Sequence, residues 1–111
     1  MAAYFLTTTP NALLKAFKKA IDEGHIVTWS YDNQGDFTHT VSQWKNLAWL
    51  RPSVQSDRLV FNIIKPQNTA ISKEVYAIYH GRMIEAMLAH FDNTFTDGVA
   101  TAAPDGNDLV A

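Results

Sequence analysis

The chain of 111 residues contains no cysteine. This absence excludes disulfide bonds, thiolate nucleophiles and zinc or iron–sulfur sites built on cysteine. Charge is also scarce, because nine Lys and Arg against eleven Asp and Glu leave a formal net charge of −2. Three of the acidic residues lie in the stretch 96–111, which has no basic residue, so the rest of the chain is close to neutral. Such a chain lacks the broad basic field that nucleic-acid binding needs.

Long hydrophobic runs are missing as well. No stretch approaches the ~18 consecutive apolar residues of a membrane-spanning helix. The first ten residues, MAAYFLTTTP, have no basic segment and too short an apolar run for a signal peptide. Hydrophobic residues make up 47% of the chain and charged residues 18%, which is the balance of an ordinary folded protein. We therefore expect a small soluble domain in the cytoplasm, with no membrane partner.

Two segments have the periodicity of helices. The first helix is predicted between Thr9 and Gly24, because Thr9 suits an N-cap, Pro10 suits the first helical position and Gly24 suits a left-handed C-terminal cap. The second is predicted at residues 72–95, where Ser72 can cap the first turn. Between them the hydrophobic period changes from helical to alternating, which indicates strands.

Residues 25–31 and 37–42 alternate on either side of a short turn, and this pattern predicts an antiparallel hairpin. Residues 4–7, 47–51 and 58–64 are further strand candidates. We predict an α+β two-layer sandwich, in which an antiparallel sheet of four to five strands carries two helices on one face. Residues 1–95 are expected to form this single domain, and residues 96–111 a disordered acidic tail.

The second predicted helix has an unusually wide apolar surface. When the segment is wound at about 100° per residue, its apolar side chains cover an arc of roughly 220°, against ~100° for a typical surface helix. Either the first helix and the sheet enclose this arc, or a second copy of the chain covers its outer part. The candidates for a partner face are Tyr76, Tyr79, Met83, Met87 and Phe91.

The histidines and acidic residues do not form a recognisable metal site. His80 and His90 are ten residues apart, which separates them by roughly 15 Å along a straight helix, too far to share one ion. The acidic turn from Asp32 to Asp36 lacks the later bidentate glutamate of a calcium loop. We expect no metal and no cofactor.

The tryptophans are the remaining candidates for binding chemistry. A hairpin centred near Gln34 places Trp29 opposite His39, and such aromatic–imidazole pairs also occur as plain packing contacts. The candidates for a ligand pocket are Trp29, His39, Trp49, Arg51 and His80.

No catalytic constellation is recognisable among these residues. The leading hypothesis is therefore a non-enzymatic binding or adaptor domain that acts through protein contacts and self-associates through the second helix. Two alternatives stay open. One is a small-ligand-binding or hydrolytic domain at the aromatic pocket, and the other is single-stranded nucleic-acid binding, which the sparse positive charge disfavours.

Overall fold

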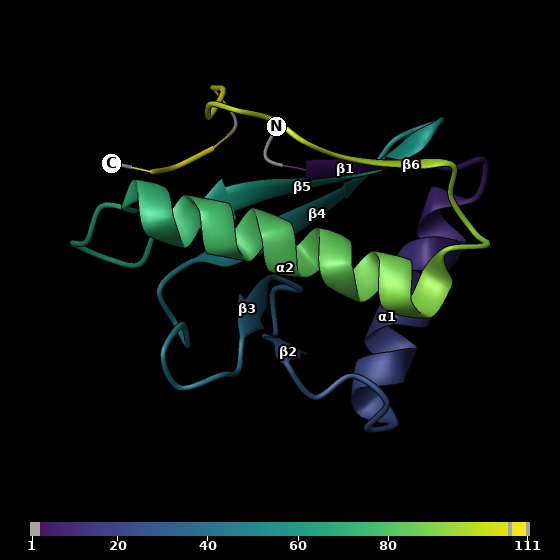
Figure 1. Ribbon diagram of the computed structural model, residues 1–111, viewed down its shortest axis with the longest axis horizontal. Coiled ribbons are helices and arrows are strands. Elements are labelled where there is room, and N and C mark those ends of the chain that lie inside the picture. The colour runs from purple at the N-terminus through teal and green to yellow at the C-terminus, as the bar shows by residue number, and fades with distance from the viewer. Residues whose placement is uncertain (1–2, 107, 111) are drawn as a thin grey trace.

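The computed structural model describes residues 3–106 and 108–110. Its elements are β1 (Ala3–Leu6), α1 (Pro10–Asp22), β2 (Trp29–Tyr31), β3 (Phe37–His39), β4 (Trp49–Val54), β5 (Arg58–Ile64), α2 (Lys73–Phe91) and β6 (Asp97–Ala100). The strands form one antiparallel sheet in the order β2-β3-β4-β5-β1-β6, and α2 runs across it in Figure 1. The α+β class is confirmed, but the sheet has six strands, so the prediction of four to five was wrong.

The β2–β3 hairpin has the register that the alternation predicted, with Trp29 opposite His39. Its turn is closed by the Asp32 carboxylate, which accepts the backbone N–H groups of Gln34 and Asp36 at 2.9 and 3.0 Å. Gly35 follows in the left-handed region at φ 80°, where a side chain would be strained. A short Asx-type turn therefore sets the pairing of the whole hairpin.

Both helices begin where the sequence predicts, but only one has a side-chain cap. The Ser72 hydroxyl accepts the N–H of Val75 at 3.1 Å and so caps α2. Thr9 precedes α1 without a capping bond from its side chain, and instead its own N–H donates to the Thr7 hydroxyl at 3.1 Å. Proline at the first helical position has no N–H, so one of the donors that a helix start leaves without an intrahelical partner is absent.

A single hydrophobic cluster joins both helices to the sheet. Its members from α1 and α2 are Leu13, Phe17, Tyr79, Met83 and Met87, and its members from the strands include Phe5, Trp29, Phe37, Leu50, Leu59, Phe61 and Ile63. Phe37 lies near the middle, with ring centroids 4.9 Å from Phe17 and 5.9 Å from Phe61. Each large apolar side chain buried in this way contributes about 1.5–3 kcal/mol.

The wide apolar arc of α2 is covered mainly by its own chain. Tyr79, Met83 and Met87 are fully buried in the cluster. Tyr76 and Phe91 are half-buried, since the Tyr76 hydroxyl donates to the Thr101 carbonyl and Phe91 meets Phe17 edge-on. Tyr79, Met83 and Met87 therefore belong to the core of the described chain, whereas a partner face at Tyr76 and Phe91 stays a prediction. The sheet is wider than predicted and the chain after α2 returns over the helix, so more internal cover exists than the sequence suggested.

The stretch expected as a disordered acidic tail differs from that expectation. Residues 97–100 form β6 and pair with β1. Further on, Asp108 accepts the N–H of Ile63 at 3.0 Å and the N–H of Asp105 at 2.9 Å. Backbone bonds from Leu109 to Ile63 and from Ile71 to Val110 hold the next residues against β5 and the start of α2. Most of these contacts are backbone hydrogen bonds, and the amino-acid composition of the segment does not predict them.

Within the described ranges, neither helix combines the length and apolar character needed to cross a membrane.

Candidate functional site

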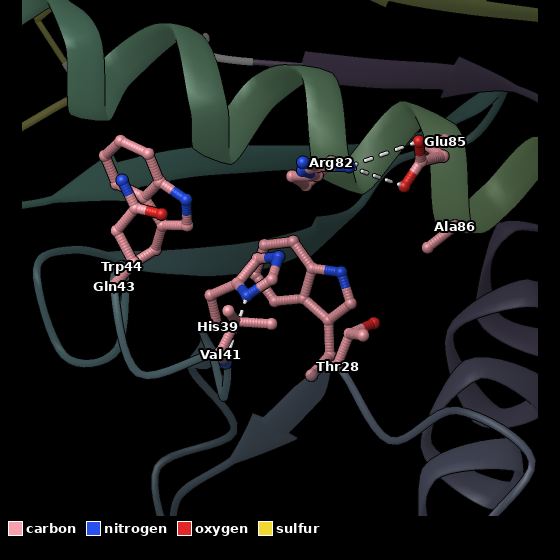
Figure 2. Close-up of a pocket in the computed structure, with 9 residues that line it drawn as sticks. Thr28, His39, Val41, Gln43, Trp44, Arg82, Glu85 and Ala86 are labelled. Atoms are coloured by element: carbon pink, nitrogen blue, oxygen red, sulfur yellow. Dashed lines mark hydrogen bonds and ion pairs between the residues drawn. The ribbon is translucent and has the colours of Figure 1, made fainter.

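A hollow of about 240 Å³ lies between the β2–β3 hairpin, the loop after β3 and α2. We call it the hairpin pocket, and Figure 2 shows the side chains around it. The residues that give it chemical character are Trp29, His39, Gln43, Trp44, Arg82 and Glu85. It combines aromatic rings, an imidazole and both signs of charge, which is the mixture typical of small-molecule sites.

The floor of the hairpin pocket consists of the rings of Trp29 and His39, which pack against Tyr79 of α2. Trp29 and His39 face each other across the hairpin with ring centroids 4.9 Å apart. Tyr79 of α2 meets Trp29 edge-on at 5.7 Å and His39 at 6.1 Å. Trp29 and His39 are only 2% and 3% exposed. The floor is therefore held rigidly from three elements of the fold.

His39 is held in its neutral form. The N–H of Val41 donates to its Nδ1 at 3.4 Å, which requires a lone pair on that atom and leaves the ring proton on Nε2. Burial lowers the pKa of His39, the Arg82 charge lowers it further, and the Glu85 charge opposes them in part. At neutral pH the imidazole is thus uncharged and belongs to the pocket as a polar aromatic ring.

The wall of the pocket is the loop that carries Gln43 and Trp44. The Tyr79 hydroxyl donates to the Trp44 carbonyl, and the Trp44 N–H donates to the Val41 carbonyl at 2.9 Å. Asn46 then takes a left-handed conformation at φ 58°, which Asn tolerates better than most residues. The loop is therefore fastened to α2 through backbone atoms, so the Trp44 side chain is placed without depending on its own hydrogen bonds.

The mouth of the pocket carries an ion pair on α2. Arg82 Nη1 donates to both carboxylate oxygens of Glu85, at 3.2 and 3.4 Å, as drawn in Figure 2. The two side chains are 47% and 67% exposed. Exposed pairs of this kind stabilise a protein by only about 0.2–1 kcal/mol. The charges of Arg82 and Glu85 thus cancel, and the two side chains can separate to bind other groups at little cost in stability.

The structure brings together two of the five sequence-predicted pocket residues, Trp29 and His39. Arg51 lies elsewhere and forms a bidentate pair with Asp36, at 3.0 and 2.9 Å, whose hydrogen bonds raise the pKa of the guanidinium. Trp49 pairs with Ile64 at the start of β4, outside the hairpin pocket. The inclusion of these two residues is corrected, because the alternation of β4 buries Leu50 in the core and turns its neighbours to the other face.

His80 also lies outside the hairpin pocket, and its inclusion is corrected too. It stacks on Tyr76 with ring centroids 3.9 Å apart and contacts the Tyr76 carbonyl one turn earlier on α2. It is buried as part of the helix packing, at 3% exposure.

The sequence did not assign Gln43, Arg82 and Glu85 to the site, and Trp44 was considered only together with the other tryptophans. Arg82 and Glu85 lie on the charged strip that the apolar arc of the second predicted helix leaves over, and such residues normally meet only water. Their spacing of three residues predicts a helical ion pair. Only the docking of α2 beside the hairpin shows that this strip closes over aromatic rings.

Among the described residues, no group of three or more His, Asp or Glu side chains is placed to hold a metal ion. Comparison of the chain with models of protein families, with curated proteins and with solved structures found no match.

Proposed function

We propose that this protein is a small binding domain whose hairpin pocket takes a small molecule. The observation that carries the proposal is the rigid floor of Trp29 and His39 beneath a mouth that holds the Arg82–Glu85 pair. Apolar walls with a few fixed polar groups provide both affinity and orientation for a ligand. The hollow of about 240 Å³ is smaller than the ~300–1,000 Å³ of drug-sized sites, which suits a small metabolite.

Binding without turnover is the better match to this site. His39 is neutral but 97% covered, and its Nδ1 accepts the Val41 N–H, so that nitrogen is not available as a base. Arg82 and Glu85 are paired with each other in the mouth. The groups are thus arranged to hold a ligand rather than to move a proton at it.

We also infer that α1 and α2 form one layer on a single face of the sheet, because both helices enter the same cluster as the inward side chains of five strands. In this arrangement β2 and β3, which have only three residues each, leave a hollow open between the hairpin and α2.

The proposal can be tested by a fragment screen followed in NMR spectra. The indole N–H signals of Trp29, Trp44 and Trp49 are assigned with single Trp→Phe variants and observed as fragments are added. Bound fragments should shift the Trp44 and Trp29 signals and leave Trp49, which lies outside the pocket, unchanged. A screen in which no compound moves the Trp44 signal, even at millimolar concentration, would dismiss the proposal.

A second candidate, self-association, has a separate observation in its favour. Val27, Val41, Leu47 and Leu88 are 73%, 43%, 38% and 52% exposed. Each of them lines the pocket or lies within three residues of one that does. Exposed apolar side chains of this kind can pack against a second copy.

Light scattering over a range of concentrations tests the second candidate. A dimer is expected to lose half its mass when Val41 and Leu47 are replaced by Ser. A mass that stays at 12.4 kDa for the wild-type chain at millimolar concentration would rule out self-association.

A further inference from the structure

We propose that the ligand of the hairpin pocket is a free α-amino acid with an apolar side chain, whose carboxylate is bound by Arg82 and whose ammonium group is bound by Glu85. This inference rests on the proposed function and names the chemical class of the ligand. It follows from the charges at the mouth, the rings beneath them and the size of the hollow between them.

The charges of the mouth match a zwitterion. Arg82 and Glu85 both line the pocket, one turn apart on α2, and their charges cancel. A purely anionic ligand would be attracted by Arg82 and repelled by Glu85, and a purely cationic ligand would meet the reverse. A group that carries both signs on neighbouring atoms satisfies both residues at once, with charge-assisted hydrogen bonds at each.

His39 does not upset this balance. Besides Arg82 and Glu85, His39 is the titratable residue that lines the pocket. Burial and the hydrogen bond that its Nδ1 accepts from the Val41 N–H keep it neutral. The pocket therefore keeps a net charge of zero at neutral pH, with its two charges confined to the mouth.

The existing ion pair can open for such a ligand. Arg82 binds Glu85 through a single nitrogen, at 3.2 and 3.4 Å, and both side chains are about half exposed or more. Guanidinium groups favour a bidentate fork to a carboxylate, and this pair does not use it. A ligand carboxylate that accepts two N–H groups would replace a weak contact by a stronger one.

The lower part of the pocket suits an apolar side chain. Trp29 and His39 form the floor, Trp44 forms one wall, and Ala86 and Val41 leave room beside them. Figure 2 shows Arg82, Glu85 and Ala86 on the same stretch of helix above these rings. An amino acid with its head group at the helix thus has its side chain directed at the aromatic floor, and the volume of about 240 Å³ suits a molecule of that size.

The test compares phenylalanine with two derivatives that each keep one charge. N-acetylphenylalanine keeps the carboxylate, and phenylalaninamide keeps the ammonium group. Affinities are measured from the Trp44 indole signal in NMR titrations. Glutamate and lysine, whose side chains are polar, are titrated for comparison with the apolar side chain of phenylalanine. Phenylalanine should bind at least about tenfold more tightly than either derivative, since each has lost one charged contact.

Two variants separate the roles of the charged residues. Arg82→Gln should weaken phenylalanine and N-acetylphenylalanine about tenfold while leaving phenylalaninamide unchanged. Glu85→Gln should weaken phenylalanine and phenylalaninamide and leave N-acetylphenylalanine unchanged. Lys73→Gln and Glu74→Gln are matched controls on the same helix, exposed and with neither residue in the hairpin pocket, and should alter none of the affinities.

The outcomes distinguish this inference from the function on which it rests. Equal affinity for phenylalanine and its two derivatives, or an equal loss for all three in Arg82→Gln, overturns the amino-acid assignment. If screening fragments shift Trp44 but no amino acid does, the pocket is a binding site for another class of molecule. If neither fragments nor amino acids shift Trp44, the proposed function itself fails. Tight binding of N-acetylphenylalanine alone would indicate the carboxyl end of a peptide and would also overturn the inference.

Discussion

The Tyr79 hydroxyl donates to the backbone carbonyl of Trp44, so a side chain of the core also holds the loop that forms the wall of the hairpin pocket. The ring of Tyr79 is fully buried between Trp29 and His39 on one side and the cluster on the other. Stability and binding are therefore coupled at this residue, and a change that loosens the core also loosens the wall.

Tyr79→Phe should measure this coupling. The variant keeps the ring but removes the Tyr79 bond to the partly buried Trp44 carbonyl, which keeps only the 3.4 Å bond from the Leu47 N–H. The loss of this hydrogen bond should cost about 0.5–1.5 kcal/mol. Urea unfolding gives the loss, and hydrogen exchange of residues 44–47 should become faster. Tyr31→Phe is the matched control, because the Tyr31 hydroxyl bonds to an exposed Asp22 carboxylate and its removal should change stability by less than about 0.5 kcal/mol. Equal effects of the two variants would contradict the assigned role.

Met87→Ala should show that the inner face of α2 is core. Met87 is fully buried, and truncation of such a side chain costs about 2–5 kcal/mol. Leu88→Ala, at the next position on the helix and 52% exposed, should cost less than about 0.5 kcal/mol. Thermal and urea unfolding of both variants decide the point. A Met87 variant with unchanged stability but a changed molecular mass would restore this face as a partner surface.

Stability should rise with pH as His39 loses its proton. Burial and the Arg82 charge hold the pKa of His39 in the folded chain below that in the unfolded chain, which is about 6.5. The unfolded chain therefore binds more protons in this range. The contribution of neutral His39 to the free energy of unfolding is fully present above about pH 6.5 and is lost as the pH falls through the folded pKa.

Urea unfolding at several pH values between 5 and 8 measures this effect. His39→Gln should flatten the dependence, whereas the exposed His90→Gln should leave it as in the wild type. If the free energy of unfolding of His39→Gln depends on pH as steeply as that of the wild type, the effect belongs to another titratable group.

Asp108→Ala should release the last described residues of the chain. The Asp108 carboxylate accepts two backbone N–H groups, including the buried one of Ile63, and loss of such acceptors costs about 1–3 kcal/mol. Hydrogen exchange of Ile63 and Leu109 should accelerate. Asp97→Ala removes an exposed carboxylate from β6 and should leave that exchange unchanged. Slow exchange at Ile63 in both variants would show that Asp108 does not hold the last described residues against β5.

The parts of the fold that the sequence predicted are those encoded locally. The register of Trp29 against His39 follows from alternation around one short turn. Ser72 marks the start of α2 because its capping bond spans three residues. The strand β6 was missed because Asp97 and Gly98 have low strand propensity, and its pairing depends on β1, almost the whole chain away.

The candidate site was predicted only where it depends on one hairpin. Trp29 and His39 are neighbours by local pairing, so they were assigned together. Arg82 and Glu85 reach the pocket only because α2 docks beside that hairpin, a long-range relationship that no local pattern carries. Arg51 was assigned to the pocket from its aromatic neighbours in the sequence, although alternation in β4 turns it away from the core and toward Asp36.

The place of β1 in the sheet affects how the chain can assemble during synthesis. β1 precedes α1 and the hairpin in the chain, yet its two neighbours in the sheet are β5 and β6, with Ala3 paired to Phe61 on one side and to Ala100 on the other. Closing such long loops costs conformational entropy before any hydrogen bond repays it. During synthesis, β1 can therefore pair with β5 only after α1 and the hairpin have been made, and its other edge stays unpaired until β6 follows.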